Sequence, residues 1–281
     1  MRKSLHLSWI YLRKSLSDIR FYLALLWIFT LDYNYVRQIR GFAADLELGV
    51  TPWLFPFLIK EPGTQFFVIL GAAILFCDAP FLTASSCWQI ARSGRSKWFY
   101  GNLFYMMELS FLYSLAIAFI PVLILIPQVA FSWKWGQVIG TLAQTDAAMQ
   151  IGIANLDYSV IVKYTPIQAM GFALLSVFLN TVLIAVVNYT LNLWTKRGTG
   201  ALFSMIIGLS PMMIRKLIHM EAGYYLSPPC WMDIGNYNWD GYGVLPSMTY
   251  IYGAFAVLIL SGIVLSYIRV KRKDLNFIEE A

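Results

Sequence analysis

Long apolar stretches constrain this chain of 281 residues more than any other feature of its sequence. A helix of roughly 20 apolar residues is long enough to cross the hydrocarbon core of a membrane. We read six such stretches, at residues 21–36, 66–82, 98–126, 167–194, 199–214 and 248–268. Charged residues make up only 13% of the chain, whereas soluble domains carry roughly 25%. The sequence therefore predicts an all-α polytopic membrane protein with six transmembrane helices.

The composition also argues against other classes of protein. The net charge is +6, but the basic residues are scattered between apolar blocks and form no continuous face for a nucleic acid. The three cysteines and two histidines lack the spacing of a zinc site. A P-loop, a nucleophile elbow and an HExxH helix are all missing. We therefore expect no nucleic-acid partner, no enzymatic activity and no directly bound metal or cofactor.

The first 20 residues carry one apolar stripe at helical spacing, made of Leu5, Trp9, Leu12, Leu16 and Ile19. Basic residues lie largely off this stripe. A basic amphipathic helix directly before a span is typical of a helix that lies in the membrane interface. The alternative is an ordinary helix packed against the rest of the protein.

The distribution of lysine and arginine predicts the orientation of the spans. Fourteen basic residues fall on one side of the predicted membrane and seven on the other. The richer side is cytoplasmic by the positive-inside rule, so both termini are expected in the cytosol. We expect the chain to be a multi-pass protein of the plasma membrane. The chain then divides into an interfacial helix (1–20), a six-span domain (21–268) and a basic cytoplasmic tail (269–281).

Three acids lie within the predicted spans, and one of them, Asp78, comes late in the second span. Asp32 ends the apolar run of the first span, and Glu108 lies about ten residues into the third. An unpaired acid in hydrocarbon costs about 2.5–3.5 kcal/mol, so such residues usually face protein or water. One interpretation is that Asp32 and Glu108 line a translocation path or a subunit seam. The other is that they pair with interfacial Arg or Tyr groups for packing.

Small residues recur at four-residue steps on the fifth span, at Gly200, Ser204 and Gly208. Such a stripe allows two helices to approach closely. It predicts either the seam of a homodimer or packing inside one subunit.

The predicted external connections are long and aromatic, over residues 37–65, 128–166 and 212–247. The stretch "TPWLFPFLI" is too short to span a membrane and is interrupted by proline, so we expect it to be interfacial or re-entrant. Tryptophans in these connections are expected at the outer headgroup level, namely Trp53, Trp133, Trp135, Trp231 and Trp239.

The connection between the second and third spans reads "FCDAPFLTASSCWQIARSGRSKWFYG". Residues 83–92 suit a short helix that a Ser or Thr caps, and Gly94 then ends it. A short helix on the cytosolic surface with an exposed aromatic and an arginine suits a protein contact. The alternative is simply a positively charged loop.

Taken together with "WGQVIGTLAQTDA" and "YTPIQAM", this string resembles the permease subunits of type-2 ABC exporters, especially small permeases of Gram-positive bacteria. The resemblance covers nearly the whole chain. It implies an elbow helix at the membrane surface and, at about 83–92, a coupling helix that docks on a separate ATPase. The residues assigned to that helix are Thr83, Ser85, Trp88, Gln89 and Arg92.

The same resemblance implies a permease dimer with two ATPase subunits, which use ATP and Mg²⁺. The first and fifth spans would form the dimer seam, and short re-entrant helices would lie between the fifth and sixth spans. The expected function is outward export of a peptide or another hydrophobic or amphipathic substrate. Two alternatives remain: a proton-coupled transporter or channel that uses Asp32 and Glu108, and a membrane subunit that docks or senses a partner without transport.

Overall fold

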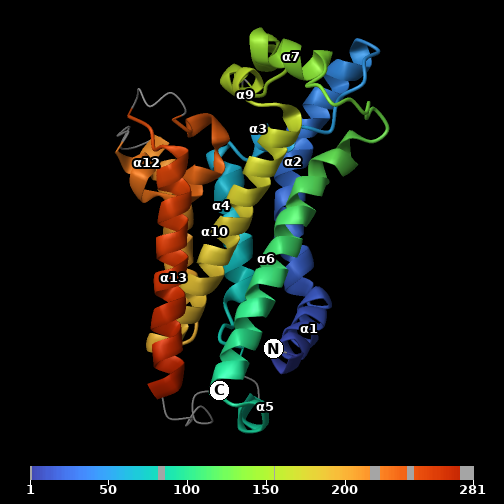
Figure 1. Cartoon of the computed structure of the whole chain (residues 1–281). Coiled ribbons are helices and arrows are strands. Elements are labelled where there is room, and N and C mark those ends of the chain that lie inside the picture. Colours follow the sequence, from blue (N-terminus) through green and yellow to red (C-terminus); the bar gives the residue numbers. More distant parts are fainter. Residues whose placement is uncertain (1, 82–85, 155, 216–221, 239–243, 273–281) are drawn as a thin grey trace.

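The computed structural model of the chain describes residues 2–81, 86–154, 156–215, 222–238 and 244–272. These residues are helical and contain no β-strand, only two isolated backbone bridges. Six helices form a bundle in which consecutive helices run in alternating directions (Figure 1). They are α2 (Ile19–Asp45), α4 (Pro62–Phe76), α6 (Arg95–Leu125), α10 (Pro166–Trp194), α11 (Thr199–Met213) and α13 (Met248–Arg272).

Three helices, α6, α10 and α13, are long and apolar enough to cross a membrane. Their length and composition indicate a membrane protein. Helices α4 and α11 are apolar but have only 15 residues each, which is about 22 Å of helix. Helix α2 has 27 residues, but charged side chains interrupt its second half.

The two ends of the bundle carry different short elements. We call them the α5 end and the α7 end, after α5 (Ser86–Ser93) and α7 (Gln137–Gln144) (Figure 1). Helix α1 (Arg2–Leu16) lies at the α5 end, where α13 also ends. The other short elements lie toward the α7 end: α3 (Phe55–Leu58), α8 (Ala147–Gln150), α9 (Tyr158–Lys163), α12 (Gly223–Leu226), η2 (Pro228–Met232) and η3 (Ile234–Asn236).

Several helix boundaries differ from the expected spans. Helix α2 continues nine residues beyond the predicted end of the first span at residue 36, and Ile39 and Ala43 extend the buried face that includes Val36. Helix α4 starts at Pro62, a residue that suits the first turn of a helix, and ends at Phe76. The carboxylate of Asp78 therefore lies beyond the end of α4 rather than inside the second predicted span.

Helix α1 packs along α6, and its predicted stripe is split. Leu12 is buried, whereas Trp9 remains 61% exposed on the side away from the bundle. Ile19 belongs to α2, because the chain turns between the two helices. The backbones come close at Gly101 of α6, where a Cβ atom would lie 2.6 Å from a methyl carbon of Leu7. The helix is therefore packed on one face and leaves an apolar face uncovered.

The stretch "TPWLFPFLI", which we expected to be interfacial or re-entrant, is packed into the protein. Its last five residues, including all of α3, are buried in the core between the long helices. Trp135 and Trp231 are also buried, and their indole N–H groups are satisfied by donating to the carbonyls of Tyr164 and Tyr224. Among the other tryptophans expected at the interface, Trp133 is exposed, and residue 239 lies outside the described residues.

Ion pairs join the short segments at the α7 end. Asp233 accepts a hydrogen bond from Arg215 at 2.8 Å, and Lys60 approaches Asp157 at 3.5 Å. The two carboxylates meet at Gly235, where a Cβ would lie 2.7 Å from Asp157 Oδ2 and 3.1 Å from Asp233 Oδ1. Burial raises the pKa of Asp233 despite the opposing effect of Arg215. These contacts bind segments that are distant in sequence into one cap.

Candidate functional site

The α5 end presents a short amphipathic helix to the outside. Within α5, Ile90 is buried against the bundle, whereas Trp88 is 75% exposed and Arg92 also points outward. The predicted helix at 83–92 is therefore found at Ser86–Ser93. Residues Thr83 and Ser85, which were expected to belong to it, lie outside the described residues. Its tryptophan and arginine are therefore exposed and are not part of the core.

Helix α5 is tied to helix α1 by a side-chain hydrogen bond. The hydroxyl of Tyr11 donates to Oε1 of Gln89 at 2.7 Å. The ring of Tyr11 also contacts Tyr105 of α6 edge-on, with centroids 5.7 Å apart. Phe81, just after α4, packs on the same Tyr105 at 4.9 Å. A displacement of α5 would therefore be transmitted to α1, to α6 and to the segment that follows α4.

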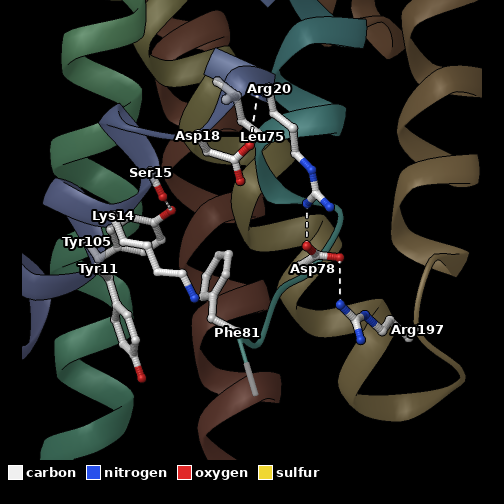
Figure 2. A pocket seen from close by; sticks show the side chains of 10 residues that line it. All are labelled: Tyr11, Lys14, Ser15, Asp18, Arg20, Leu75, Asp78, Phe81, Tyr105 and Arg197. Carbon is white, nitrogen blue, oxygen red and sulfur yellow. Dashed lines mark hydrogen bonds and ion pairs between the residues drawn. The ribbon is translucent and has the colours of Figure 1, made fainter. Parts of the chain in front are cut away.

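The carboxylate of Asp78 joins three parts of the chain at this end (Figure 2). It forms one ion pair with Arg20 at the start of α2 and a second with Arg197, between α10 and α11, at 2.9 Å. Burial raises the pKa of Asp78, but hydrogen bonds from the two arginines outweigh this effect and hold the pKa below its ordinary value. The carboxylate is therefore ionised at neutral pH and clamps the ends of α2, α4 and the α10–α11 hairpin.

Asn192, in the last turn of α10, reinforces this junction. Its side-chain amide nitrogen donates to the carbonyls of Cys77 at 3.0 Å and Ala79 at 2.8 Å. Its amide oxygen accepts the backbone N–H of Gly200 at 2.9 Å. One side chain thus satisfies backbone groups on both sides of Asp78 and at the beginning of α11.

A cavity of about 220 Å³ lies beside the clamp. Its lining combines charged and aromatic groups from α1, the end of α4 and α6 (Figure 2). Ser15 and Tyr105 share a hydrogen bond of 2.5 Å on one wall, and Asp78 and Arg20 form the other. The lining holds no cysteine or histidine, and the described residues contain no group of three side chains suited to a metal. The side chains around the cavity therefore connect α1, α2, α6 and the segment after α4.

The structure places the two intramembrane acids differently. Glu108 accepts a hydrogen bond from the hydroxyl of Ser8 on α1 at 3.1 Å, so it faces the α1–α6 contact. The second carboxylate oxygen of Glu108, Oε2, is buried and has no hydrogen-bond partner among the described residues. Asp32 is only 2% exposed on the buried face of α2, and its Oδ1 has no hydrogen-bond partner among the described residues. The two carboxylates therefore do not share one site.

The small-residue stripe of α11 is covered by the same chain. A Cβ on Gly200 would lie 2.5 Å from the Cα of Asn188 in α10, and Ser204 accepts a hydrogen bond from the Asn188 amide at 2.9 Å. Gly208 lies against α4, where an added Cβ would meet the side chain of Ile69. The stripe accounts for close packing inside one subunit, so these three residues are not exposed to form a dimer seam.

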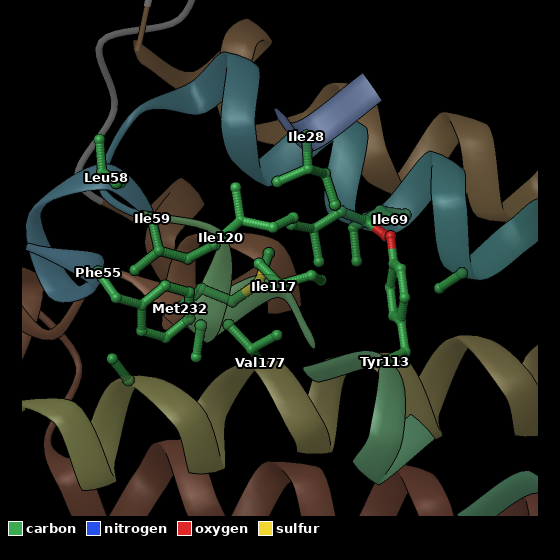
Figure 3. Close-up of a cluster of buried hydrophobic side chains, with 14 of the residues drawn as sticks. Ile28, Phe55, Leu58, Ile59, Ile69, Tyr113, Ile117, Ile120, Val177 and Met232 are labelled. Atoms are coloured by element: carbon green, nitrogen blue, oxygen red, sulfur yellow. The ribbon is translucent and has the colours of Figure 1, made fainter. Parts of the chain in front are cut away.

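The α7 end of the bundle is closed by apolar side chains (Figure 3). Phe55 and Ile59 from the α3 region and Met232 from η2 fill the space beside Ile117 of α6 and Val177 of α10. All five side chains are almost completely buried. Any passage through the bundle would require these plugging segments to move.

Sequence reasoning missed the clamp around Asp78, which was read as part of a span. A signal was present, because Arg20, Asp78 and Arg197 all fall at the same predicted membrane boundary. An acid among many basic residues at one boundary is expected to attract the nearest of them. The sequence could not say which arginines these would be.

The chain matches no protein-family model, no curated protein and no solved structure with which it was compared. Its function therefore has to be inferred from its own residues and geometry.

Proposed function

We propose that the chain is the permease subunit of an ATP-driven exporter of the type-2 ABC class. The observation that carries this proposal is α5, a short amphipathic helix that exposes Trp88 and Arg92 at one end of the bundle. An exposed tryptophan and arginine on a rigid helix suit a stable contact with another protein. In this proposal, the contact is with a separate ATPase in the cytosol, which binds ATP and Mg²⁺.

Six membrane crossings are consistent with the short helices α4 and α11. Irregular backbone is tolerated at membrane depth only where protein buries it. The segment before α4, including Phe55 and Leu58, is buried, as are Trp231 and Met232 of η2 beyond α11. These segments complete two crossings that 15 residues of helix cannot make alone. With the positive-inside rule, the α5 end and both termini are then cytoplasmic in the plasma membrane.

The contacts at the α5 end support a mechanical route for coupling. ATP binding in the partner would shift α5, and the Tyr11–Gln89 hydrogen bond would carry the shift to α1. The Asp78 clamp would carry it to α2 and to the α10–α11 hairpin. Rigid shifts of these helices would then open the plugged α7 end. A peptide or another hydrophobic or amphipathic molecule is the substrate class we propose.

A second copy of the chain completes the proposed assembly. Helices α2 and α11 flank α4 on either side, and both expose large apolar side chains, including Trp27 and Ile206. Pairing of these faces would form a homodimer that carries two ATPase subunits. The seam would then use the outer faces of α2 and α11 rather than the stripe at Gly200.

Co-purification with a soluble ATPase tests the proposal. We expect the Trp88→Ala/Arg92→Ala double variant to lose association at least tenfold, because such anchors contribute about 2 kcal/mol or more at protein contacts. Trp133→Ala is the matched control, since its side chain is 76% exposed at the opposite end. Association is measured by pull-down, and coupling by substrate-stimulated ATP hydrolysis in proteoliposomes.

Unchanged association and unchanged coupled hydrolysis in the double variant would refute the assignment of α5. The buried Asp32 favours a proton-coupled transporter as the second candidate, because its Oδ1 has no partner among the described residues. Substrate movement by the permease alone along a proton gradient would favour that candidate instead.

A further inference from the structure

An open groove of about 800 Å³ lies at the α7 end, away from the proposed docking helix. One wall is the segment 132–137, after α6, and the other is the segment 161–168, which leads into α10. Exposed Trp133 and Val162 are among its apolar lining residues. Its floor is held in place, because Trp135 donates to the carbonyl of Tyr164 at 3.0 Å. The groove is therefore a built feature and not a gap between loose segments.

The groove lies at the ends of two long apolar helices. Helix α6 ends at Leu125 and α10 begins at Pro166, and the groove is formed by the segment that follows α6 and by the segment that leads into the first turn of α10. Two further apolar side chains are exposed at these helix ends, Ile126 directly after α6 and Ile167 in the first turn of α10. In a membrane that these helices cross, the groove would lie at the level of the lipid headgroups.

The groove is positively charged. Lys134 and Lys163 both line it and are exposed, and no acid is part of its lining. In the described part of the chain, neither lysine takes part in an ion pair, whereas Lys60 nearby is paired with Asp157. Two free ammonium groups above an apolar, tryptophan-bearing surface complement a molecule with an anionic head and an apolar tail.

We propose that this groove binds an anionic phospholipid of the leaflet at the α7 end, which is the outer leaflet in the proposed orientation. The headgroup phosphate would lie between Lys134 and Lys163, and Trp133 would cover the glycerol region. The acyl chains would run along Ile126 and Ile167. The inference requires only that α6 and α10 cross a membrane, so it stands apart from the proposed export function.

Native mass spectrometry of the full-length protein in detergent tests the lipid site. The protein is titrated with phosphatidylglycerol, with phosphatidylcholine and with inorganic phosphate. We expect tighter binding of phosphatidylglycerol than of phosphatidylcholine. Replacement by glutamine should weaken phosphatidylglycerol binding about fivefold for Lys134 or Lys163 alone, and roughly 25-fold for the double variant Lys134→Gln/Lys163→Gln.

Arg37→Gln serves as the control, because it removes an exposed cation from α2 that does not line the groove. It should leave the lipid preference intact. The lysines are exposed, so the variants should keep the melting temperature of the parent protein, and this is measured alongside. A double variant that retains the preference would overturn the proposal. Displacement of the lipid by inorganic phosphate at similar concentration would do so too, by indicating a site for free phosphate.

Discussion

Asp78 shows how one side chain can organise an end of a membrane protein. Its neighbours come from the start of α2 and from the α10–α11 connection, which are far apart in sequence. Because the side chains of Arg20, Asp78 and Arg197 are between 33% and 61% exposed, solvent screens the ion pairs. The ion pairs therefore contribute little to the free energy of unfolding, and their main effect is to fix the positions of the helices relative to one another.

We expect Asp78→Asn to lower the free energy of unfolding by about 1 kcal/mol at pH 7, since it removes two screened ion pairs. The folded-state pKa of Asp78 is lowered, so the pairs stabilise the protein above the ordinary Asp pKa of about 3.9 and are lost as the pH falls through the lowered value. Thermal unfolding in detergent at pH 7 and at pH 3 measures both effects.

The Asp45→Asn variant is the control for this experiment, because that carboxylate is exposed at the end of α2. It should match the parent protein at both pH values. A difference between parent and Asp78→Asn that persists undiminished at pH 3 would contradict the ion-pair explanation.

At the scale of elements, the contact between α10 and α11 depends on the absence of side chains. The backbone of α11 approaches that of α10 at Gly200, where an added Cβ would lie 2.5 Å from the Cα of Asn188 and 2.9 Å from its carbonyl oxygen. Asn188 and Asn192 then bond across the contact. The two helices therefore form a closely packed hairpin. A movement of the segment that connects them would move both helices together.

Gly200→Ala should therefore destabilise the protein by roughly 1–3 kcal/mol, because α11 has to move away from α10 backbone atoms that cannot yield. Gly253→Ala in α13 is the matched control, since nothing lies within 4 Å of its added Cβ. We expect the control to be neutral or slightly stabilising. Equal melting temperatures of the two variants would contradict the close approach.

On the scale of the whole molecule, the two ends of the bundle have different characters. The α5 end is basic and held by charged side chains, whereas the α7 end is a cap of short helices plugged with apolar residues. This difference suits a protein that receives a mechanical signal at one end and opens at the other. The proposed orientation assigns the first end to the cytosol.

Labelling on intact cells tests that orientation. Phe131→Cys and Arg92→Cys are made separately in a chain whose three native cysteines are replaced by serine. Both positions are exposed, at the α7 end and the α5 end respectively. A membrane-impermeant maleimide should label Phe131→Cys on intact cells and Arg92→Cys only after lysis. The reverse pattern would invert the assignment of the two faces.

Much of the element structure followed from local patterns. The fourth and sixth long helices begin within one residue of prediction, because Thr165–Pro166 and the start of an apolar run are strong local signals. The end of α2 was not predicted, because the outer face of its last turns is polar. Only the helical spacing of the apolar residues Val36, Ile39 and Ala43 indicates that the helix continues. The short helix predicted at 83–92 is found at Ser86–Ser93, and residues 83–85 lie outside the described part of the chain.

The residues of the candidate site were less predictable. Gln89 stood out as part of a short helix, but its partner Tyr11 comes from a helix 78 residues earlier. Of the two interpretations of the stripe at Gly200, the structure agrees with packing inside one subunit. The sequence could not choose between them, because a stripe of small residues predicts close helix approach but does not identify the approaching helix.

By itself, the sequence determined that this chain is helical and apolar, with a charge distribution that favours one orientation. These are properties of local composition and period, since a long apolar run has few other ways to satisfy its backbone. Only the tertiary structure decided that Asp78 is a clamp, that the α11 stripe faces α10, and that Lys134 and Lys163 share a groove. Such pairings depend on which distant segments pack together, and local propensity contains no information about that choice.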